Sequence, residues 1–177
     1  MRLSTESEIQ AFLMARELIK RGLRTHVIGS LTGLSPQQVR CLYDIMGIRT
    51  VGNRGGPTPK TATVCRNRMT QVRLSIFATI YHRLNGRKAG SKIDPAKLIL
   101  SYDTAQALCP TPELDLTLAW TLATELKLGL VELHGCPDCA ASYIRILESL
   151  RIPLSCPFCA VRARMARRLS ASQASGP

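Results

Sequence analysis

Residues 136–159 read CPDCAASYIRILESLRIPLSCPFC and contain two Cys-x2-Cys pairs separated by sixteen residues. Each pair, Cys136 with Cys139 and Cys156 with Cys159, predicts a tight knuckle that directs two sulfurs at one metal ion. Four thiolates complete a tetrahedral shell and leave no position for water, so such a site is structural rather than catalytic. The spacing therefore predicts one structural zinc ion per chain.

The residues around these pairs predict a zinc ribbon over 131–169 that ends in a basic helix. Short strands are expected at 142–147 and 151–154, between the two pairs. A ribbon of this size buries little core, so metal binding supplies its folding free energy. The alternatives are chance placement of the cysteines or a redox pair. His134 could also replace a cysteine, but a closed four-thiolate shell needs no fifth ligand.

The first 130 residues predict a helical domain, which makes the whole chain mainly α. Apolar residues recur at helical spacing, and capping residues mark the helix ends. A turn-rich linker is expected at 52–60 and a disordered tail at 170–177. The expected helices cover residues 6–21, 24–31, 35–46, 63–84, 94–107 and 113–128.

Residues 24–46 predict a hairpin that resembles a helix-turn-helix. Ser35 can cap the second helix, Pro36 suits its first turn, and Gln38 completes a capping box. On this interpretation the residues at the start of the second helix read base edges in the major groove. The alternative is a hairpin that serves packing alone. The candidate base-reading residues are Ser35, Gln37, Gln38 and Arg40.

The net charge of +12 is unevenly spread along the chain. Residues 49–97 carry eleven basic side chains and one acid, residues 98–160 carry three and seven, and residues 161–177 carry four arginines and no acid. Such separation favours a polyanionic partner, and nucleic acid is the obvious one. The alternatives are solubility alone and, for the last arginines, a solvated helix end. The candidate phosphate contacts are Arg54, Lys60, Arg66, Arg68, Arg73, Arg162, Arg164, Arg167 and Arg168.

Several classes of protein fit the sequence poorly. A run of eighteen apolar residues and a signal-peptide h-region are both missing, which favours a cytoplasmic protein with reduced thiols and no membrane partner. Open-site metal motifs and a Walker-type phosphate loop are missing too, so we expect no enzyme. A zinc-ribbon RNA-binding or ribosome-associated protein stays an alternative. It would need exposed aromatics for base stacking, and aromatics make up 5% of the chain.

The segment 116–159 resembles the FlhC family, the zinc-containing subunit of the bacterial flagellar master activator. The matching pieces are Ala119-Trp120-Thr121-Leu122, Gly129-Leu130, the four cysteines at the family's spacing, and a basic segment beyond them. Leu18-Ile19 with Gly22, the hairpin, and Leu42-Tyr43 extend the similarity toward the N-terminus.

The resemblance implies a mainly helical protein with a C-terminal zinc ribbon, whose ligands would be the four cysteines. It implies a small helical FlhD-like partner in a heterohexamer that binds promoter DNA and recruits RNA polymerase. Relatives of the SetC and AcaC type switch on conjugative transfer genes. The flagellar proteins have a tryptophan-containing stretch where residues 61–73 are polar and arginine-rich here. This departure favours conjugative over flagellar target genes.

Overall fold

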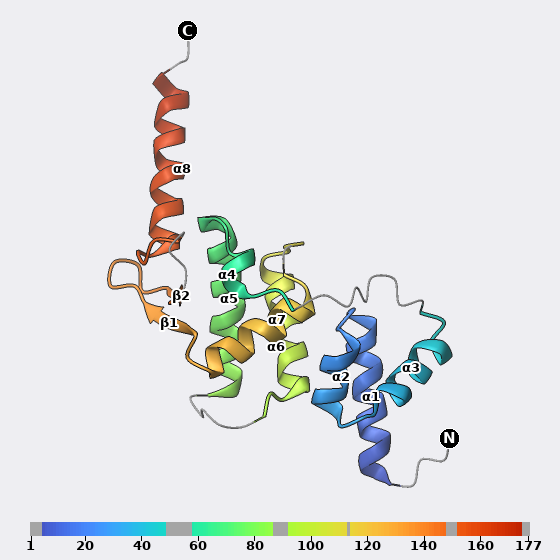
Figure 1. The fold of residues 1–177 in the computed structure, drawn as a ribbon. Coiled ribbons are helices and arrows are strands. Elements are labelled where there is room, and N and C mark those ends of the chain that lie inside the picture. The colour runs from blue at the N-terminus through green and yellow to red at the C-terminus, as the bar shows by residue number, and fades with distance from the viewer. Residues whose placement is uncertain (1–4, 49–57, 87–91, 113, 148–151, 175–177) are drawn as a thin grey trace.

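The computed structural model describes residues 5–48, 58–86, 92–112, 114–147 and 152–174. In chain order its elements are α1 (Glu6–Lys20), α2 (Thr25–Thr32), α3 (Pro36–Ile45), α4 (Thr61–Val64), α5 (Arg68–Asn85), α6 (Pro95–Leu108), α7 (Leu116–Lys127), β1 (Val131–Gly135), β2 (Ser142–Ile146) and α8 (Pro157–Ala174). They are mostly helices: α5 packs with α6, α7, α8 and a small two-stranded sheet, while α1, α2 and α3 form a group beside them (Figure 1). The predicted mainly helical fold is confirmed.

Helices α1, α2 and α3 form an apolar unit at the N-terminal end. The Thr5 side chain caps α1 by accepting from the Glu8 backbone N–H at 3.3 Å. Leu18, Ile28 and Val39, one from each helix, are fully buried. Helix α2 contacts both α1 and α3. Apolar residues at helical spacing in each segment are therefore sufficient to close this small core.

The α2–α3 connection confirms the predicted hairpin. Helix α2 ends at Gly33, whose φ of 76° lies in the left-handed region that favours glycine. The Gln38 N–H donates to Ser35 Oγ at 3.2 Å, and the Ser35 N–H donates to Gln38 Oε1 at 2.8 Å. This reciprocal pair is a capping box, and Pro36 occupies the first position of α3.

The single helix expected at 63–84 is instead two helices. The short helix α4 ends at Cys65, and α5 begins after Asn67. The Asn67 side chain accepts the Thr70 backbone N–H at 2.9 Å, so it caps α5 and offers the backbone an alternative to a continuous helix. Arg68 is thereby placed in the first turn of α5.

Helices α6 and α7 pack beside α5 and bury much of its surface. Asp94 caps α6 as predicted, through the backbone N–H groups of its first turn. Asp115 caps α7 by accepting the Leu118 N–H at 2.7 Å, so this helix begins later than in the expected range 113–128. Gly129, with φ 72°, follows its last turn and confirms the predicted stop.

An ion pair joins the N-terminal unit to the central helices. Arg21 at the end of α1 donates from Nε and Nη2 to the two carboxylate oxygens of Asp103 on α6, at 3.1 and 2.9 Å. The paired geometry raises the pKa of Arg21 further above its already high value, chiefly through the hydrogen bond with Asp103. Both side chains are part-exposed, so the pair sets orientation more than stability.

The sheet is a ribbon, but its strands differ from those predicted. Strand β1, at 131–135, pairs antiparallel with β2 in the register Leu133 with Ile144. The prediction of a strand near 142–147 is confirmed, whereas the strand expected at 151–154 is wrong within its described residues, 152–154. Pro153 there has no N–H to donate to a ladder. Ile144 and Val131 are buried in the same apolar cluster as the helices.

Helix α8 extends from the ribbon away from the rest of the molecule, as Figure 1 shows in red. It reaches Ala174, so residues 170–174, which we expected to be disordered, are helical. The Ser170 hydroxyl donates to the Ala166 carbonyl at 3.0 Å, one turn back. Within the part of the chain that the structure describes, none of the helices is both long and apolar enough to span a membrane.

Candidate metal centre and nucleic-acid interface

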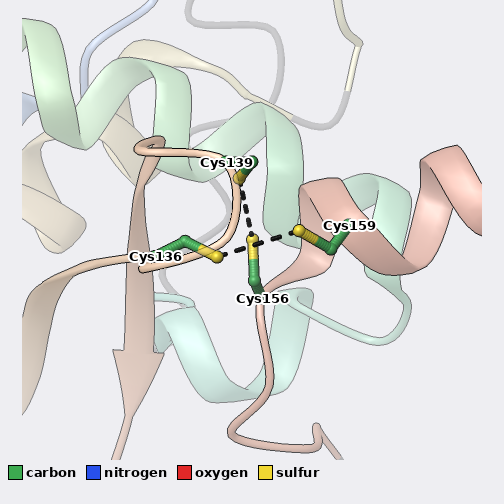
Figure 2. A group of neighbouring side chains, drawn as sticks. All are labelled: Cys136, Cys139, Cys156 and Cys159. Atoms are coloured by element: carbon green, nitrogen blue, oxygen red, sulfur yellow. Dashed lines mark hydrogen bonds between the residues drawn. The ribbon is translucent and has the colours of Figure 1, made fainter.

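The four cysteine sulfurs converge on one point between the ribbon and the start of α8 (Figure 2). They all lie within 4.8 Å of one another. The Cys136 and Cys159 sulfurs are 3.8 Å apart, and those of Cys139 and Cys156 are 3.7 Å apart. A tetrahedral thiolate shell with Zn–S bonds of about 2.3 Å has sulfur–sulfur edges of about 3.8 Å. The geometry therefore fits one tetrahedral metal ion.

Two different local structures present the two pairs. The first pair lies in a turn after β1, closed by hydrogen bonds of 2.9 Å from the Ala140 N–H to the Cys136 carbonyl and from the Cys136 N–H to the Ala141 carbonyl. Ala140 has φ 56°, a left-handed conformation that costs a non-glycine residue about 1 kcal/mol.

The second pair is built from the first turn of α8. Cys156 immediately precedes the helix, Pro157 is its first residue, and the Ala160 N–H donates to the Cys156 carbonyl at 3.2 Å. Proline suits this position because a first-turn N–H has no partner inside the helix. The positive end of the helix dipole also favours thiolates here. A bound metal would consequently fix the base of α8.

The thiols differ in how readily they ionise. Burial alone would raise the pKa of Cys136, but the backbone N–H groups of Cys139 and Asp138 and the neighbouring thiols lower it to about 7. The hydrogen bond with the Cys139 thiol, together with burial, raises the pKa of Cys159 to about 12. Burial also raises the pKa of Cys156. The Cys136 thiol therefore ionises more readily than the thiols of Cys156 and Cys159, whose protons a bound cation would displace.

The surroundings of the cluster favour a closed site. Cys136 and Cys156 share a buried cluster with Tyr143, and Phe158 packs against it. The Tyr143 hydroxyl donates to the Leu154 carbonyl at 3.0 Å, which ties β2 to the loop before the second pair. An apolar cover of this kind limits solvent access to a metal.

His134 lies outside the cluster. Its Nε2 is 3.0 Å from Arg145 Nη1 and 3.3 Å from Glu132 Oε2. Among the described residues, the group that can hold a metal comprises the four cysteines. The donor set of four thiolates suits zinc or iron.

A row of polar side chains on α5 holds the outer edge of β2. The Gln71 amide donates from Nε2 to the Ile144 carbonyl at 2.9 Å, and the Ile144 N–H donates to Ser75 Oγ at 3.0 Å. The Ser75 hydroxyl in turn donates to the Gln71 carbonyl at 2.6 Å. Strand β1 pairs with the opposite edge of β2, so these contacts satisfy backbone groups that would otherwise be unpaired.

Arg68, one of the predicted phosphate contacts, lies at the end of this row. Its Nη1 donates to the Pro153 carbonyl at 2.9 Å and to the Ser155 carbonyl at 2.7 Å. Ser155 immediately precedes Cys156. Arg68 thus positions the loop that presents the second cysteine pair, and a phosphate contact from this residue stays a prediction.

The other predicted nucleic-acid contacts fall into two groups. In the hairpin, Gln37 and Arg40 are exposed, while Ser35 and Gln38 bond to each other in the capping box. Helices α3 and α8 lie on opposite sides of the view in Figure 1. Any base reading by the hairpin would therefore use a different part of the molecule from the arginines of α8.

The second group lies near the ribbon. Arg162, Arg164, Arg167 and Arg168 are exposed on α8. Lys60 and Arg66 are exposed around α4, Arg73 is half-buried on α5, and α5 contacts α8. Arg54 lies outside the described residues.

Sequence reasoning missed the α5 row and β1. A signal for the row exists, because Gln71, Ser75 and Thr79 recur every four residues and so lie on one face of the helix. A signal for β1 exists as well, since apolar Val131 and Leu133 alternate with polar residues. The polar row on α5 and strand β1 both precede Cys136 in the sequence, whereas both predicted strands lie between the two cysteine pairs.

Comparisons with known proteins identify the family to which the chain belongs. A family model described as "Flagellar transcriptional activator (FlhC)" matches residues 2–172. The flagellar transcriptional regulator FlhC of Erwinia tasmaniensis is 28% identical over 180 residues, covering 95% of each chain. FlhC of Proteus mirabilis is 29% identical, covering 94% of this chain and 88% of its own. FlhC of Cupriavidus metallidurans is 25% identical, covering 94% and 78%.

The fold and the site define a mainly helical protein with a C-terminal four-cysteine ribbon. The chain belongs to the FlhC family of flagellar transcriptional activators. A transcriptional regulator is not an enzyme class.

Proposed function

We propose that this chain is a zinc-containing, DNA-binding subunit of a transcriptional activator that works in the cytoplasm. Zinc is the ion that the four-thiolate donor set and its tetrahedral spacing suit best. The family supplies the regulatory role. The finer parts of the proposal concern what the metal site does for DNA binding, which partners take part, and which genes respond.

One observation carries the DNA-binding proposal: the second cysteine pair is the beginning of a basic helix. Cys156 and Cys159 lie at the start of α8, whose exposed side chains include four arginines and no acid. A metal that holds both cysteines fixes the direction in which α8 leaves the ribbon. The arginines then contact phosphates as a positioned set, which places the protein on the duplex without reading sequence.

The salt dependence of duplex binding tests this assignment. Each phosphate that the protein no longer neutralises should reduce the slope of log affinity against log salt by about 0.9. We expect Arg164→Ala with Arg167→Ala to flatten the slope by roughly 1 to 2 and to weaken binding to all duplexes alike. The matched control removes two exposed arginines on other helices, Arg16 on α1 and Arg83 on α5. Equal slopes for the two double variants would overturn the assignment.

The same measurements separate duplex DNA from RNA. Every tryptophan, tyrosine and phenylalanine of the sequence lies in the described part of the chain, and each is buried or half-buried. Stacking of single-stranded bases requires exposed rings. We therefore expect a promoter duplex to outcompete single-stranded RNA of equal length. Preference for the RNA would favour the zinc-ribbon RNA-binding alternative.

The partners and target genes belong to the same proposal. We expect a FlhD-like small helical subunit in a heterohexamer, promoter recognition aided by the α2–α3 hairpin, and recruitment of RNA polymerase. The arginine-rich residues 61–73 support conjugative transfer genes as targets, while the names of the relatives support flagellar genes. Footprinting of both promoter classes with the co-expressed subunits distinguishes them. Protection of flagellar promoters alone would overturn the conjugative assignment.

A further inference from the structure

The N-terminal unit has an apolar groove between α1 and α3, away from the metal site. The groove has a volume of about 860 Å³. Several large apolar side chains along it are exposed, notably Leu13 at 50%, Ile45 at 73% and Ile9 at 43%. The full lining is Ile9, Phe12, Leu13, Arg16, Lys20, Cys41, Leu42, Ile45, Met46 and Ile48. A contiguous apolar surface of this kind marks an interaction site.

The side of the groove formed by α1 has the spacing of a helix-packing seam. Ile9, Leu13, Arg16 and Lys20 follow one another at intervals of four, three and four residues, which is one face of a helix. The seam is apolar in the first half of α1 and basic in the second half. Its half-exposed aliphatic side chains suit a long occupant, because a small ligand is usually enclosed over most of its surface.

The charge of the groove indicates the chemistry of that occupant. Both charged residues in its lining, Arg16 and Lys20, are basic. A helix with an apolar stripe followed by acids on the same face would complement both halves of the seam. A second copy of this chain fits less well, because a chain with a net charge of +12 repels itself.

We propose that this groove is a docking site for an amphipathic helix of a partner protein, with its apolar face against Ile9, Leu13 and Ile45 and its acidic end against Arg16. The proposal deepens the partner-dependence proposed above by locating a surface for a partner. It does not depend on DNA binding. Lys20 already forms an ion pair with Glu17 at 2.7 Å, so Arg16 is the better residue for testing the charge preference.

Binding of synthetic helical peptides to the full, metal-loaded chain tests the proposal. One peptide of about twenty residues has leucines at i, i+3, i+4 and i+7 followed by glutamates on the same face, and its pair has lysines in their place. Fluorescence anisotropy should show that the glutamate peptide binds about tenfold more tightly than the lysine peptide. Equal affinity for the two peptides, or binding by neither, would overturn the proposal.

Variants locate the binding and test the charge. We expect Ile45→Glu to weaken binding of the glutamate peptide at least about tenfold, because it places a charge in the apolar contact. The matched control is Leu108→Glu on α6, 69% exposed and outside the groove lining, which should change nothing. Arg16→Glu should shift the preference toward the lysine peptide by about two- to fivefold.

Two further measurements, duplex affinity and sedimentation, distinguish loss of the groove contact from other effects of the substitutions. Ile45 and Leu108 are both largely exposed, so neither substitution removes core packing, and unchanged duplex affinity would show that the DNA site is intact. Sedimentation of the chain alone shows whether it self-associates. A dimer that Ile45→Glu dissociates would assign the groove to a second copy and overturn the heterologous partner.

Discussion

The N-terminal unit of α1 to α3 and the ribbon with α8 are stabilised in different ways. The N-terminal unit closes around side chains that are apolar and nearby in sequence, such as Leu18, Ile28 and Val39. Among the described residues the ribbon has two strands, which bury Val131 and Ile144 in the main apolar cluster. Polar side chains of α5 also bond to it across about seventy residues of chain, as between Gln71 and Ile144. The cysteine cluster is a further constraint on the ribbon.

This difference indicates where each region can fail. A two-stranded sheet alone is marginal in water, so we expect the ribbon to depend on the proposed metal and on α5. We expect the N-terminal unit to depend on neither, and it leaves some apolar surface exposed in a groove. Three substitutions test this contrast. One removes a proposed metal ligand, one removes a hydrogen bond between α5 and β2, and one removes a helix cap in the N-terminal unit.

Removal of the metal site should have the largest effect, confined to the ribbon and α8. Structural zinc contributes roughly 10–16 kcal/mol of binding free energy in small zinc-finger peptides. We expect Cys136→Ala to reduce metal content from one ion per chain to none, and to collapse the amide resonances of β1, β2 and α8. Resonances of α1 to α3 should keep their positions. The measurement is metal analysis together with backbone NMR.

A chelator provides the matched control for this substitution. Chelator-treated wild-type protein should give the spectrum of the Cys136→Ala variant, and zinc should restore only the wild type. If the variant kept ordered ribbon resonances and bound its promoter normally, the metal would be incidental to both folding and function.

Loss of a hydrogen bond from the row of polar side chains on α5 should have an intermediate effect on the same region. Gln71 is 1% exposed, and its side chain is the donor to the Ile144 carbonyl. Gln71→Leu leaves that buried carbonyl without this donor, which should reduce the free energy of unfolding by about 1–3 kcal/mol. Hydrogen exchange should report faster opening of β2 than of α2, with the metal still bound.

Thr79→Val is the control for Gln71→Leu. The Thr79 hydroxyl reaches the Ser142 carbonyl only at 3.4 Å, a weak contact, so its loss should cost less than that of Gln71. Equal destabilisation by the two substitutions would show that packing of α5, rather than the Gln71 hydrogen bond, holds the ribbon.

Much of the fold was accessible from the sequence because local chemistry determines it. The capping box of Ser35 and Gln38, the Asp94 cap and the Gly129 stop each act within one helical turn. The break at Asn67 was not predicted, because apolar residues recur on both sides of it. The signal for the break is a single side chain, that of Asn67, which caps the second helix. The strands were harder, since pairing of Leu133 with Ile144 depends on a contact across the cysteine knuckle.

The candidate site likewise contains residues that the sequence predicts and residues whose role only the fold shows. The four cysteines could be proposed as metal ligands from their spacing, because a knuckle is a local structure. The role of Arg68 could not, because its guanidinium could bind either a phosphate or a carbonyl, and only the fold brings Pro153 and Ser155 within reach. The groove between α1 and α3 was also missed. Exposed and buried apolar residues look alike in a sequence, and only packing shows which side of a helix lacks a partner.

The smallest expected effect concerns the N-terminal unit, and it completes the contrast. Ser35→Ala removes the side-chain acceptor for the Gln38 N–H, which should cost about 1 kcal/mol of unfolding free energy. Because this unit does not rely on the metal, the same loss should appear in metal-loaded and chelator-treated protein, measured by urea unfolding followed at α1 to α3. Ser35→Asp keeps an acceptor and should stay close to wild type. A loss that differed between the two metal states would show that the hairpin and the ribbon fold as one cooperative unit, which would remove the distinction between the two regions.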